Sequence, residues 1–165
     1  KIDILVNNSG AFDGGPVDKI TVDQWNRVIG VNVTGMFLGI REVFPIMKRQ
    51  GGGRIINIGS IAAQRARHSS VPYTTSKHAV WGLTQASALE GRDFGIAVSC
   101  IHPGNTEVER RSGGKSSTGR DEGPEPSIGT NDIGQTALIM ATLPQGSNML
   151  EAIVLPLSQD YLGRG

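Results

Sequence analysis

A tyrosine and a lysine stand four residues apart in the segment Tyr73-Thr74-Thr75-Ser76-Lys77. On a helix this spacing places both side chains on one face and within reach of each other. A nearby ammonium stabilises a phenolate, so the pair is suited to proton exchange as a general acid/base. A tyrosine and a lysine at this spacing also occur by chance in many chains, where the two residues have a structural role and no catalytic one. The neighbouring motifs must therefore decide between the two interpretations.

Ser60 is the second candidate for chemistry, because it ends an apolar run that begins at Arg54. Such a run without polar alternation is typical of a buried parallel strand. Open α/β sheets bind their ligands at the carboxyl ends of the strands, so the Ser60 hydroxyl could hold a substrate oxygen. A helix cap or a turn is the simpler alternative for a serine at this place.

Asn32 is the third candidate, since it interrupts an otherwise apolar helical stretch between Val31 and Val33, with Gly30 and Gly35 nearby. A break of this kind often marks a kink or a functional site within a helix. A solvent-facing position on the helix is an equally good explanation from the sequence alone.

The elements that must position these residues alternate along the chain. Short apolar runs predict strands over residues 2–8, 54–60, 96–101 and 151–156. Helical periodicity predicts helices over residues 21–51, 73–91 and 132–143. The alternation indicates an α/β fold with a doubly wound parallel sheet, formed by one domain over residues 1–165. We expect the first strand to be buried on both faces.

Residues 105–131 form a polar segment rich in Gly, Ser and Pro. Its length favours a mobile substrate-binding loop over a simple connector. Within it, residues 114–116 (Gly-Lys-Ser) resemble the end of a phosphate-binding loop, but Glu109 stands where the first glycine of that motif should be.

Composition narrows the class of partner. The 165 residues are 38% hydrophobic with a formal net charge of +1, which disfavours nucleic acid and an anionic membrane surface as partners. The sequence contains no run of about 18 apolar residues, so it predicts no membrane-spanning helix. The single cysteine, Cys100, reads as a buried strand thiol and predicts a reducing, cytoplasmic setting. His68, His78 and His102 are too scattered to predict a metal site, and we interpret each as an ordinary loop, helix or strand-end residue.

Five motifs in this chain occur in the order of one known family. They are Asn7-Asn8-Ser9-Gly10 after the first strand, Asn32, Ser60, the Tyr73/Lys77 pair, and Pro103-Gly104 after the third strand. Together they resemble the short-chain dehydrogenase/reductase family, and the resemblance covers essentially the whole chain. It implies a Rossmann-like fold and hydride transfer between NAD or NADP and a small-molecule carbonyl or alcohol substrate.

The resemblance implies a role for each matched residue. Asn32, Ser60, Tyr73 and Lys77 match the catalytic tetrad of the family. Tyr73 would exchange a proton with the substrate oxygen, and Ser60 would orient and stabilise that oxygen. Lys77 would assist Tyr73 and bind the nicotinamide ribose. Asn32 would hold a water molecule that links Lys77 to solvent.

Cofactor contacts at the nicotinamide end follow from the same resemblance. Besides Tyr73 and Lys77, the family places Pro103, Gly104 and the backbone of Thr106 there. The agreement loosens at this end, because the family commonly has a branched apolar residue at the position of Thr106 and a threonine at that of Val108.

Asn7, Ser9 and Gly10 match the family segment on the adenosine side of the cofactor, where alanine is usual at Ser9. The glycine-rich turn that holds the pyrophosphate in the family does not occur in this sequence. The fold is therefore expected to be incomplete, beginning at about the fourth strand of the family. We expect these residues to be part of a longer enzyme, with a genuine truncation as the alternative. In the family, the residue that selects NAD or NADP follows the second strand, which does not occur in this sequence. The sequence therefore predicts no preference between the two cofactors.

The function predicted from the sequence is an oxidoreductase that interconverts a secondary alcohol and a ketone with NAD(P). The alternative is a catalytically inactive, truncated remnant that acts as a binding or assembly module. By resemblance, the helix over 21–51 and the helix that follows Tyr73 pair across dimer and tetramer interfaces, which predicts a homo-oligomer.

Overall fold

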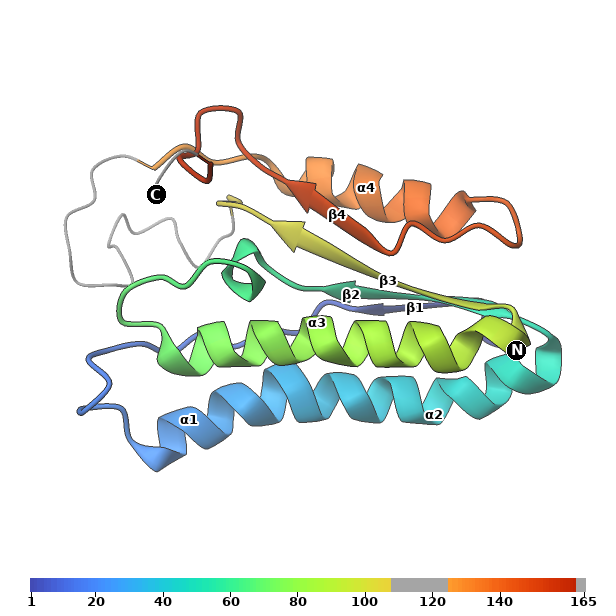
Figure 1. Cartoon of the computed structure of the whole chain (residues 1–165), viewed down its shortest axis with the longest axis horizontal. Helices are drawn as coiled ribbons and strands as arrows, with labels where there is room; N and C mark the ends of the chain where they lie inside the picture. The colour runs from blue at the N-terminus through green and yellow to red at the C-terminus, as the bar shows by residue number, and fades with distance from the viewer. Residues whose placement is uncertain (108–124, 163–165) are drawn as a thin grey trace.

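The computed structural model describes residues 1–107 and 125–162. Within these ranges one sheet contains the strands β1 (Ile4–Asn7), β2 (Gly53–Ile58), β3 (Ile96–Pro103) and β4 (Glu151–Val154). The strands lie in the order β1-β2-β3-β4, and all neighbours are parallel (Figure 1). This arrangement confirms the predicted parallel α/β fold.

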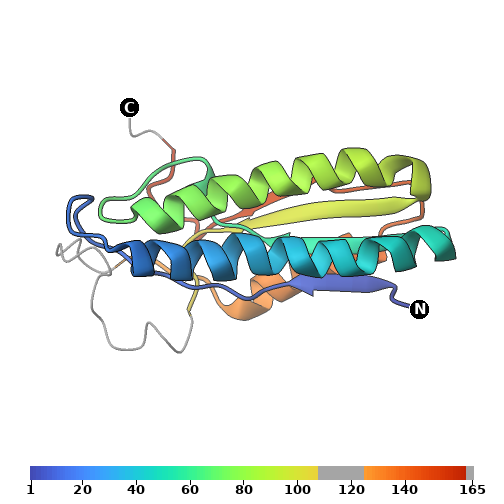
Figure 2. The ribbon, with the colours of Figure 1, turned by 90° about the horizontal axis from the view of Figure 1, so that it is seen from below.

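Helices connect the strands and cover both faces of the sheet. They are α1 (Val22–Ile29), the π-helical turn η1 (Gly30–Thr34), α2 (Gly35–Gln50), the 3₁₀ turn η2 (Ile61–Ala63), α3 (Val71–Gly91), the 3₁₀ turn η3 (Arg92–Phe94) and α4 (Thr130–Thr142). Helices α2 and α3 run side by side along the sheet (Figure 2). Each expected helix is present, with bounds that differ by only a few residues.

Alternate residues of the central strands divide the core into two layers. On one face, Ile55 and Val98 pack against α2 and α3 in a cluster that includes Val80. On the other face, Ile56 and Ile101 pack against α4. Because successive strand residues point to opposite faces, two adjacent isoleucines serve two separate layers. The helices therefore enclose β2 and β3 between them.

The long helix begins and ends with recognisable caps. The Thr21 hydroxyl accepts the backbone N–H of Gln24, and the Gln24 side chain accepts the backbone N–H of Thr21, which together form a capping box. Gly51 ends α2 with φ 81°, a left-handed conformation that glycine adopts without strain. Between these caps the helical path is continuous, but it widens into the π-helical turn at Asn32, where the sequence predicted a break.

The prediction that the first strand is buried on both faces is wrong for this chain. Leu5 and Asn7 face α2, which approaches so closely that a Cβ atom at Gly39 would lie 2.9 Å from Asn7 Oδ1. Ile4 and Val6 point to the opposite face and are 47% and 48% exposed. The reason is position in the sheet: β1 lies at an edge, and α4 covers β2, β3 and β4 instead.

One helical stretch, Val22–Gln50, is long and apolar enough to span a membrane by length and composition. Core helices of globular proteins meet the same criterion. Met36, Ile40 and Met47 of this stretch are buried against the sheet, whereas Phe37 and Leu38 are exposed.

The expected mobile loop over 105–131 falls mostly on residues 108–124, which lie outside the described residues. Its two ends are described. Thr106 pairs with Ile128, and the N–H of Glu107 donates to the Ile128 carbonyl over 2.9 Å. The two ends of the predicted loop therefore meet at the carboxyl end of β3.

Candidate active site

The carboxyl ends of the strands bring the candidate residues to one side of the sheet. Asn7 ends β1, Ser60 follows β2 by two residues, and Pro103 ends β3. Helix α3 also begins on this side, so Tyr73 and Lys77 in its first two turns approach the same region (Figure 1). Parallel topology explains this convergence, because all the strand ends share one edge.

Tyr73 and Lys77 lie on one face of α3, as their spacing predicted. The Lys77 Nζ atom is 5.5 Å from the centre of the Tyr73 ring. The Lys77 side chain is only 4% exposed, and its ammonium donates to the backbone carbonyl of Ile58 over 2.9 Å. The lysine therefore joins α3 to the end of β2, and its charge lies beside the phenol ring.

Ser60 lies where β2 turns into η2, and it forms the N-cap that the simpler interpretation predicted. Its Oγ atom accepts the N–H of Ala62 over 3.1 Å, and its carbonyl accepts the N–H of Ala63 over 2.9 Å. A hydroxyl that accepts one hydrogen bond keeps its own proton for a second partner. Capping the turn is thus compatible with binding a substrate oxygen.

Asn32 is 1% exposed, so the solvent-facing alternative is wrong. Its Oδ1 atom accepts the N–H of Ala11 over 2.7 Å, and its Nδ2 atom donates to the carbonyl of Ala11 over 2.9 Å. The same Nδ2 group donates to Ser76 Oγ over 2.8 Å. Asn32 therefore joins the segment after β1 to helix α3. Its expected role in holding a water molecule stays a prediction.

Ser76 is a residue of the site to which the sequence motifs assigned no role. It is fully buried between Tyr73 and Asn32, and its hydroxyl donates to the Tyr73 carbonyl over 2.7 Å while accepting from Asn32. Its place beside Lys77 within the Tyr73 motif was the only signal in the sequence.

The Tyr73 ring is also in contact with the Phe12 ring, with centroids 5.2 Å apart.

The adenosine-side candidates lie after β1. Asn7 donates from Nδ2 to Asn57 Oδ1 over 2.8 Å, joining β1 to β2. Ser9 is exposed, and Gly10 lies against Asn32, whose Oδ1 atom would be 3.9 Å from a Cβ at that glycine. The segment is thus held by the site residue Asn32 on one side and open on the other.

The nicotinamide-end candidates lie after β3. The Gly104 N–H donates to the Val154 carbonyl over 2.8 Å, and a Cβ at Gly104 would overlap Gln159. Thr106 Oγ1 donates to the Gly104 carbonyl over 3.2 Å. Pro103 is partly buried at the strand end. Val108, which stands where the family commonly has a threonine, lies outside the described residues.

A buried histidine also touches the site, and the sequence interpretation missed its contact. His102 is 0% exposed, and its Nδ1 atom lies 2.9 Å from the Ser60 carbonyl oxygen. Burial lowers the pKa of His102, and the nearby Glu151 partly opposes this shift. Next to it, burial raises the pKa of the Cys100 thiol to about 11, so that thiol stays protonated and unreactive.

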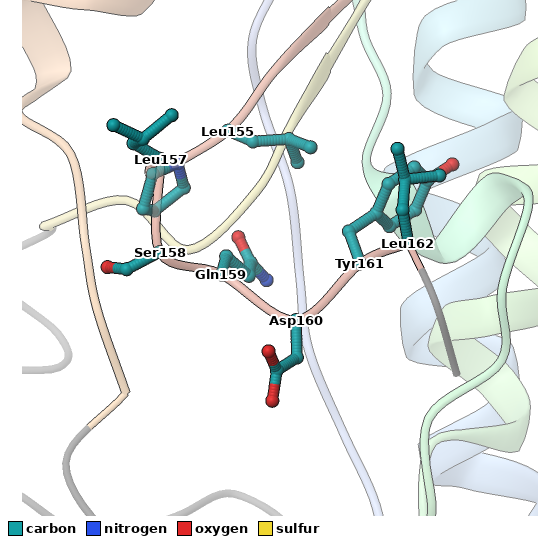
Figure 3. Close-up of a pocket in the computed structure, with 8 residues that line it drawn as sticks. Leu155, Leu157, Ser158, Gln159, Asp160, Tyr161 and Leu162 are labelled. Atoms are coloured by element: carbon teal, nitrogen blue, oxygen red, sulfur yellow. The ribbon is translucent and has the colours of Figure 1, made fainter.

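A hollow at the end of the described chain lies apart from the tetrad. It is lined by residues 155–162 alone (Figure 3). The segment is fixed to the loops around it, because Gln159 Oε1 accepts the N–H of Asn105 over 3.0 Å and Tyr161 bonds to Gln64. We assign no chemistry to this hollow, since its wall contains none of the candidate catalytic residues.

Comparison with known proteins decides the family. The family model for short chain dehydrogenases matches residues 1–117, which include the whole candidate tetrad. The chain belongs to the short-chain dehydrogenase/reductase family. Residues beyond 117 lie outside this match, so the family model covers β1 to β3 and the helices between them.

Individual short-chain dehydrogenases resemble the chain over part of their length. A trans-4-hydroxycyclohexanecarboxylate dehydrogenase from Sinomonas cyclohexanicum is 40% identical over 119 residues, 72% of this chain and 46% of the relative. A 3-alpha-(or 20-beta)-hydroxysteroid dehydrogenase from Mycobacterium bovis is 46% identical over 101 residues, 61% of this chain and 39% of the relative. The chain thus spans less than half the length of the curated relatives it matches.

Solved structures agree with the sheet topology. The closed form of a serine dehydrogenase complexed with NADP+ superposes with a TM-score of 0.86 at 27% sequence identity. The match covers 99% of this chain and 68% of that structure. The four-stranded sheet of this chain therefore corresponds to part of a short-chain dehydrogenase fold that binds NADP in a relative.

Proposed function

We propose that these residues form the catalytic part of an oxidoreductase that interconverts a secondary alcohol and a ketone by hydride transfer with NAD(P). The observation that carries the proposal is the Tyr73/Lys77 pair. A buried ammonium lies 5.5 Å from the phenol ring, near the carboxyl ends of the strands, where open α/β sheets bind their ligands. Within the described residues, no hydrogen bond occupies the Tyr73 hydroxyl. The phenol is therefore free to exchange a proton with a substrate.

The residues present fit the nicotinamide half of the cofactor. The Lys77 ammonium has three N–H donors and spends one of them on the Ile58 carbonyl. The others can bind ribose hydroxyls. When bound, the nicotinamide ring supplies or accepts the hydride. The glycine-rich turn that would bind the pyrophosphate half of the cofactor does not occur in this sequence. We therefore assign no residue of this chain to the pyrophosphate.

The proton side of the reaction can be assigned to this chain's own groups. Tyr73 donates its hydroxyl proton to the carbonyl oxygen in reduction and takes it back in oxidation. Ser60 accepts the Ala62 N–H at Oγ, which leaves its hydroxyl proton available to donate a hydrogen bond to the same oxygen. Lys77 holds its ammonium 5.5 Å from the centre of the Tyr73 ring and is itself held by the Ile58 carbonyl. Asn32 donates to Ser76 and so holds α3, the helix that carries Tyr73 and Lys77, in place.

The test is a pair of tyrosine variants in the complete polypeptide. Tyr73→Phe keeps the ring against Phe12 and removes only the hydroxyl, so turnover should fall by about a thousandfold, as for loss of a general acid. NAD(P)H binding, followed by cofactor fluorescence, should change far less than turnover. Tyr161→Phe is the matched control, because it removes the other tyrosine hydroxyl of the chain, which bonds to Gln64. Near-normal turnover in Tyr73→Phe would refute the mechanism.

The substrate panel for this test should contain cyclic secondary alcohols and their ketones. The names of two relatives, a hydroxycyclohexanecarboxylate and a hydroxysteroid dehydrogenase, describe such alcohols. Both NAD and NADP should be tried with each substrate. Turnover with one cofactor alone would identify the preference that the sequence leaves open.

A second function, a binding or assembly module without turnover, is favoured by one observation. Leu138 and Ile139 of α4 are 55% and 53% exposed, and apolar surfaces of this kind mark interaction sites. The two functions differ in cofactor affinity. A folded complete polypeptide that binds neither NADH nor NADPH would favour the module and exclude the enzyme.

We also propose a homo-oligomer, dimer or tetramer, formed through α2 and α3. Large apolar side chains stay exposed on both helices, including Phe37, Leu38 and Leu89. Light scattering of the purified protein measures the assembly directly. A monomer at micromolar concentration would exclude it.

A further inference from the structure

The imidazole of His102 touches both backbone polar atoms of Ser60. The Nδ1 atom lies 2.9 Å from the Ser60 carbonyl oxygen and 3.3 Å from the Ser60 nitrogen. A protonated Nδ1 donates to the carbonyl, whereas an unprotonated one accepts the N–H. The shorter distance favours donation to the carbonyl. Either way, the ring holds the residue whose hydroxyl faces the substrate in the proposed function.

The ring is held tightly in this position. Trp81 packs edge-on against it, with centroids 5.5 Å apart and planes at 79°. Gly59 also lies against the ring, where a Cβ atom would be 2.7 Å from His102 Nδ1 and 2.8 Å from the Cys100 sulfur. Only glycine leaves room for the imidazole at this point. The fit indicates that the His102 ring is built into the turn after β2.

The far side of the ring faces a carboxylate. His102 Nε2 is buried and makes no hydrogen bond within the described residues, and Glu151 Oε1 lies 3.4 Å away. That contact is an ion pair only when the imidazole is protonated, and burial favours the neutral ring. Gln64 donates to the same carboxylate oxygen over 2.5 Å. With the ring neutral, the Ser60 contact is the hydrogen bond that His102 makes.

The turn that carries Ser60 is held by residues of the site at every step. Lys77 donates to the Ile58 carbonyl, Gly59 donates to the Ile101 carbonyl over 2.7 Å, and His102 holds Ser60. The Ser60 side chain is in turn held by the Ala62 N–H. Ser60 Oγ accepts in this contact, so its hydroxyl proton is available to bind a ligand.

We propose that His102 is a positioning residue, which aims the Ser60 hydroxyl at the substrate oxygen by holding the Ser60 backbone through Nδ1. The role rests on the proposed dehydrogenase function, because Ser60 is assumed to bind the reacting oxygen. His102 itself touches neither substrate nor cofactor.

Two amide variants separate this role from simple packing. In His102→Asn, the side-chain nitrogen lies two bonds from Cβ, like Nδ1, and can still donate to the Ser60 carbonyl. In His102→Gln, the amide lies one bond further out, toward Glu151, and the Ser60 contact is lost. The complete polypeptide is the protein to use for both.

Steady-state kinetics should distinguish the variants. We expect His102→Gln to lower kcat by about tenfold, the effect of one lost hydrogen bond, and His102→Asn to stay within about threefold of the parent. The KM for NAD(P)H should not change in either variant, since the serine contacts the substrate. Equal losses of kcat in both variants, or no loss in either, would overturn the proposal.

Amide hydrogen exchange supplies a readout that does not depend on activity. The N–H groups of Ala62 and Ala63 both donate to Ser60, so they report on the turn. They should exchange faster in His102→Gln than in His102→Asn. If the parent protein turns over no substrate, the proposed function fails, and exchange alone decides the positioning role. Identical exchange in the two variants would then refute it.

Discussion

The amide of Asn32 donates to Ser76 Oγ over 2.8 Å and thereby joins the π-helical turn to the helix of Tyr73 and Lys77. Ser76 lies between the two candidate catalytic residues and donates to the Tyr73 carbonyl. The first turn of α3 is therefore positioned by a buried asparagine from a different helix.

Replacing Asn32 with aspartate should destabilise the fold more than removing its partner hydroxyl. Aspartate keeps the size of the side chain, but it loses both donated hydrogen bonds and buries a carboxyl group. We expect Asn32→Asp to lower the free energy of unfolding by about 2 kcal/mol or more, and Ser76→Ala by about 1 kcal/mol. Urea denaturation measures both. Equal losses would show that the contacts with Ala11 contribute nothing.

A second buried chain of polar groups supports β1 and β2. Asn57 Nδ2 donates to Thr84 Oγ1 over 2.9 Å, and Asn57 Oδ1 accepts from Asn7. Thr84→Val removes the acceptor at constant shape and leaves a buried donor unpaired, at a cost of about 2 kcal/mol. Thr84→Ser keeps the hydroxyl and loses one methyl group, at a cost of about 1 kcal/mol. Thermal or urea denaturation should rank the variants in this order, and the reverse order would contradict the network.

Acid should destabilise the protein partly through His102. Its pKa is lowered from 6.5 in the folded state, mainly by burial. Below pH 6.5 the unfolded chain therefore takes up a proton that the folded chain does not, so stability is complete above this pH and falls as the pH drops. His102→Asn removes this contribution. The loss of unfolding free energy between about pH 7 and pH 5 should be smaller in the variant than in the parent.

Alkali should destabilise the protein partly through Cys100, with the opposite sign. Burial raises the thiol pKa from 9.0 to about 11 in the folded state. Between these values the unfolded chain releases a proton that the folded chain retains, so stability is complete below pH 9 and decreases toward pH 11. The shift corresponds to about 3 kcal/mol. Cys100→Ser should show a shallower alkaline decline, and an unchanged decline would exclude this source.

The same burial predicts a slow reaction with thiol reagents. Cys100 is fully buried, and the thiolate is the reactive form. The folded protein should react with a disulfide reagent much more slowly than the urea-unfolded protein at the same pH, followed by absorbance. Comparable rates in the two states would indicate that this part of the core opens readily.

Local sequence patterns predicted the elements well, because helix and strand periodicity depend on near neighbours. The apolar run at 54–60 and the helical pattern after Tyr73 both appear where expected. The polar break at Asn32 correctly indicated an irregular turn. The prediction failed at β1, since the exposure of Ile4 and Val6 depends on the place of the strand in the sheet and not on its own residues.

By itself, the sequence determined the order of strands and helices, the spacing of Tyr73 and Lys77 on one helix face, and the motifs that identify the family. These features depend on residues close together in the chain. Only the tertiary structure placed His102 against Ser60, 42 residues away, and Asn32 against Ser76, 44 residues away. Parallel strands bring their carboxyl ends to one edge, and the packing of helices on that edge decides which side chains meet there.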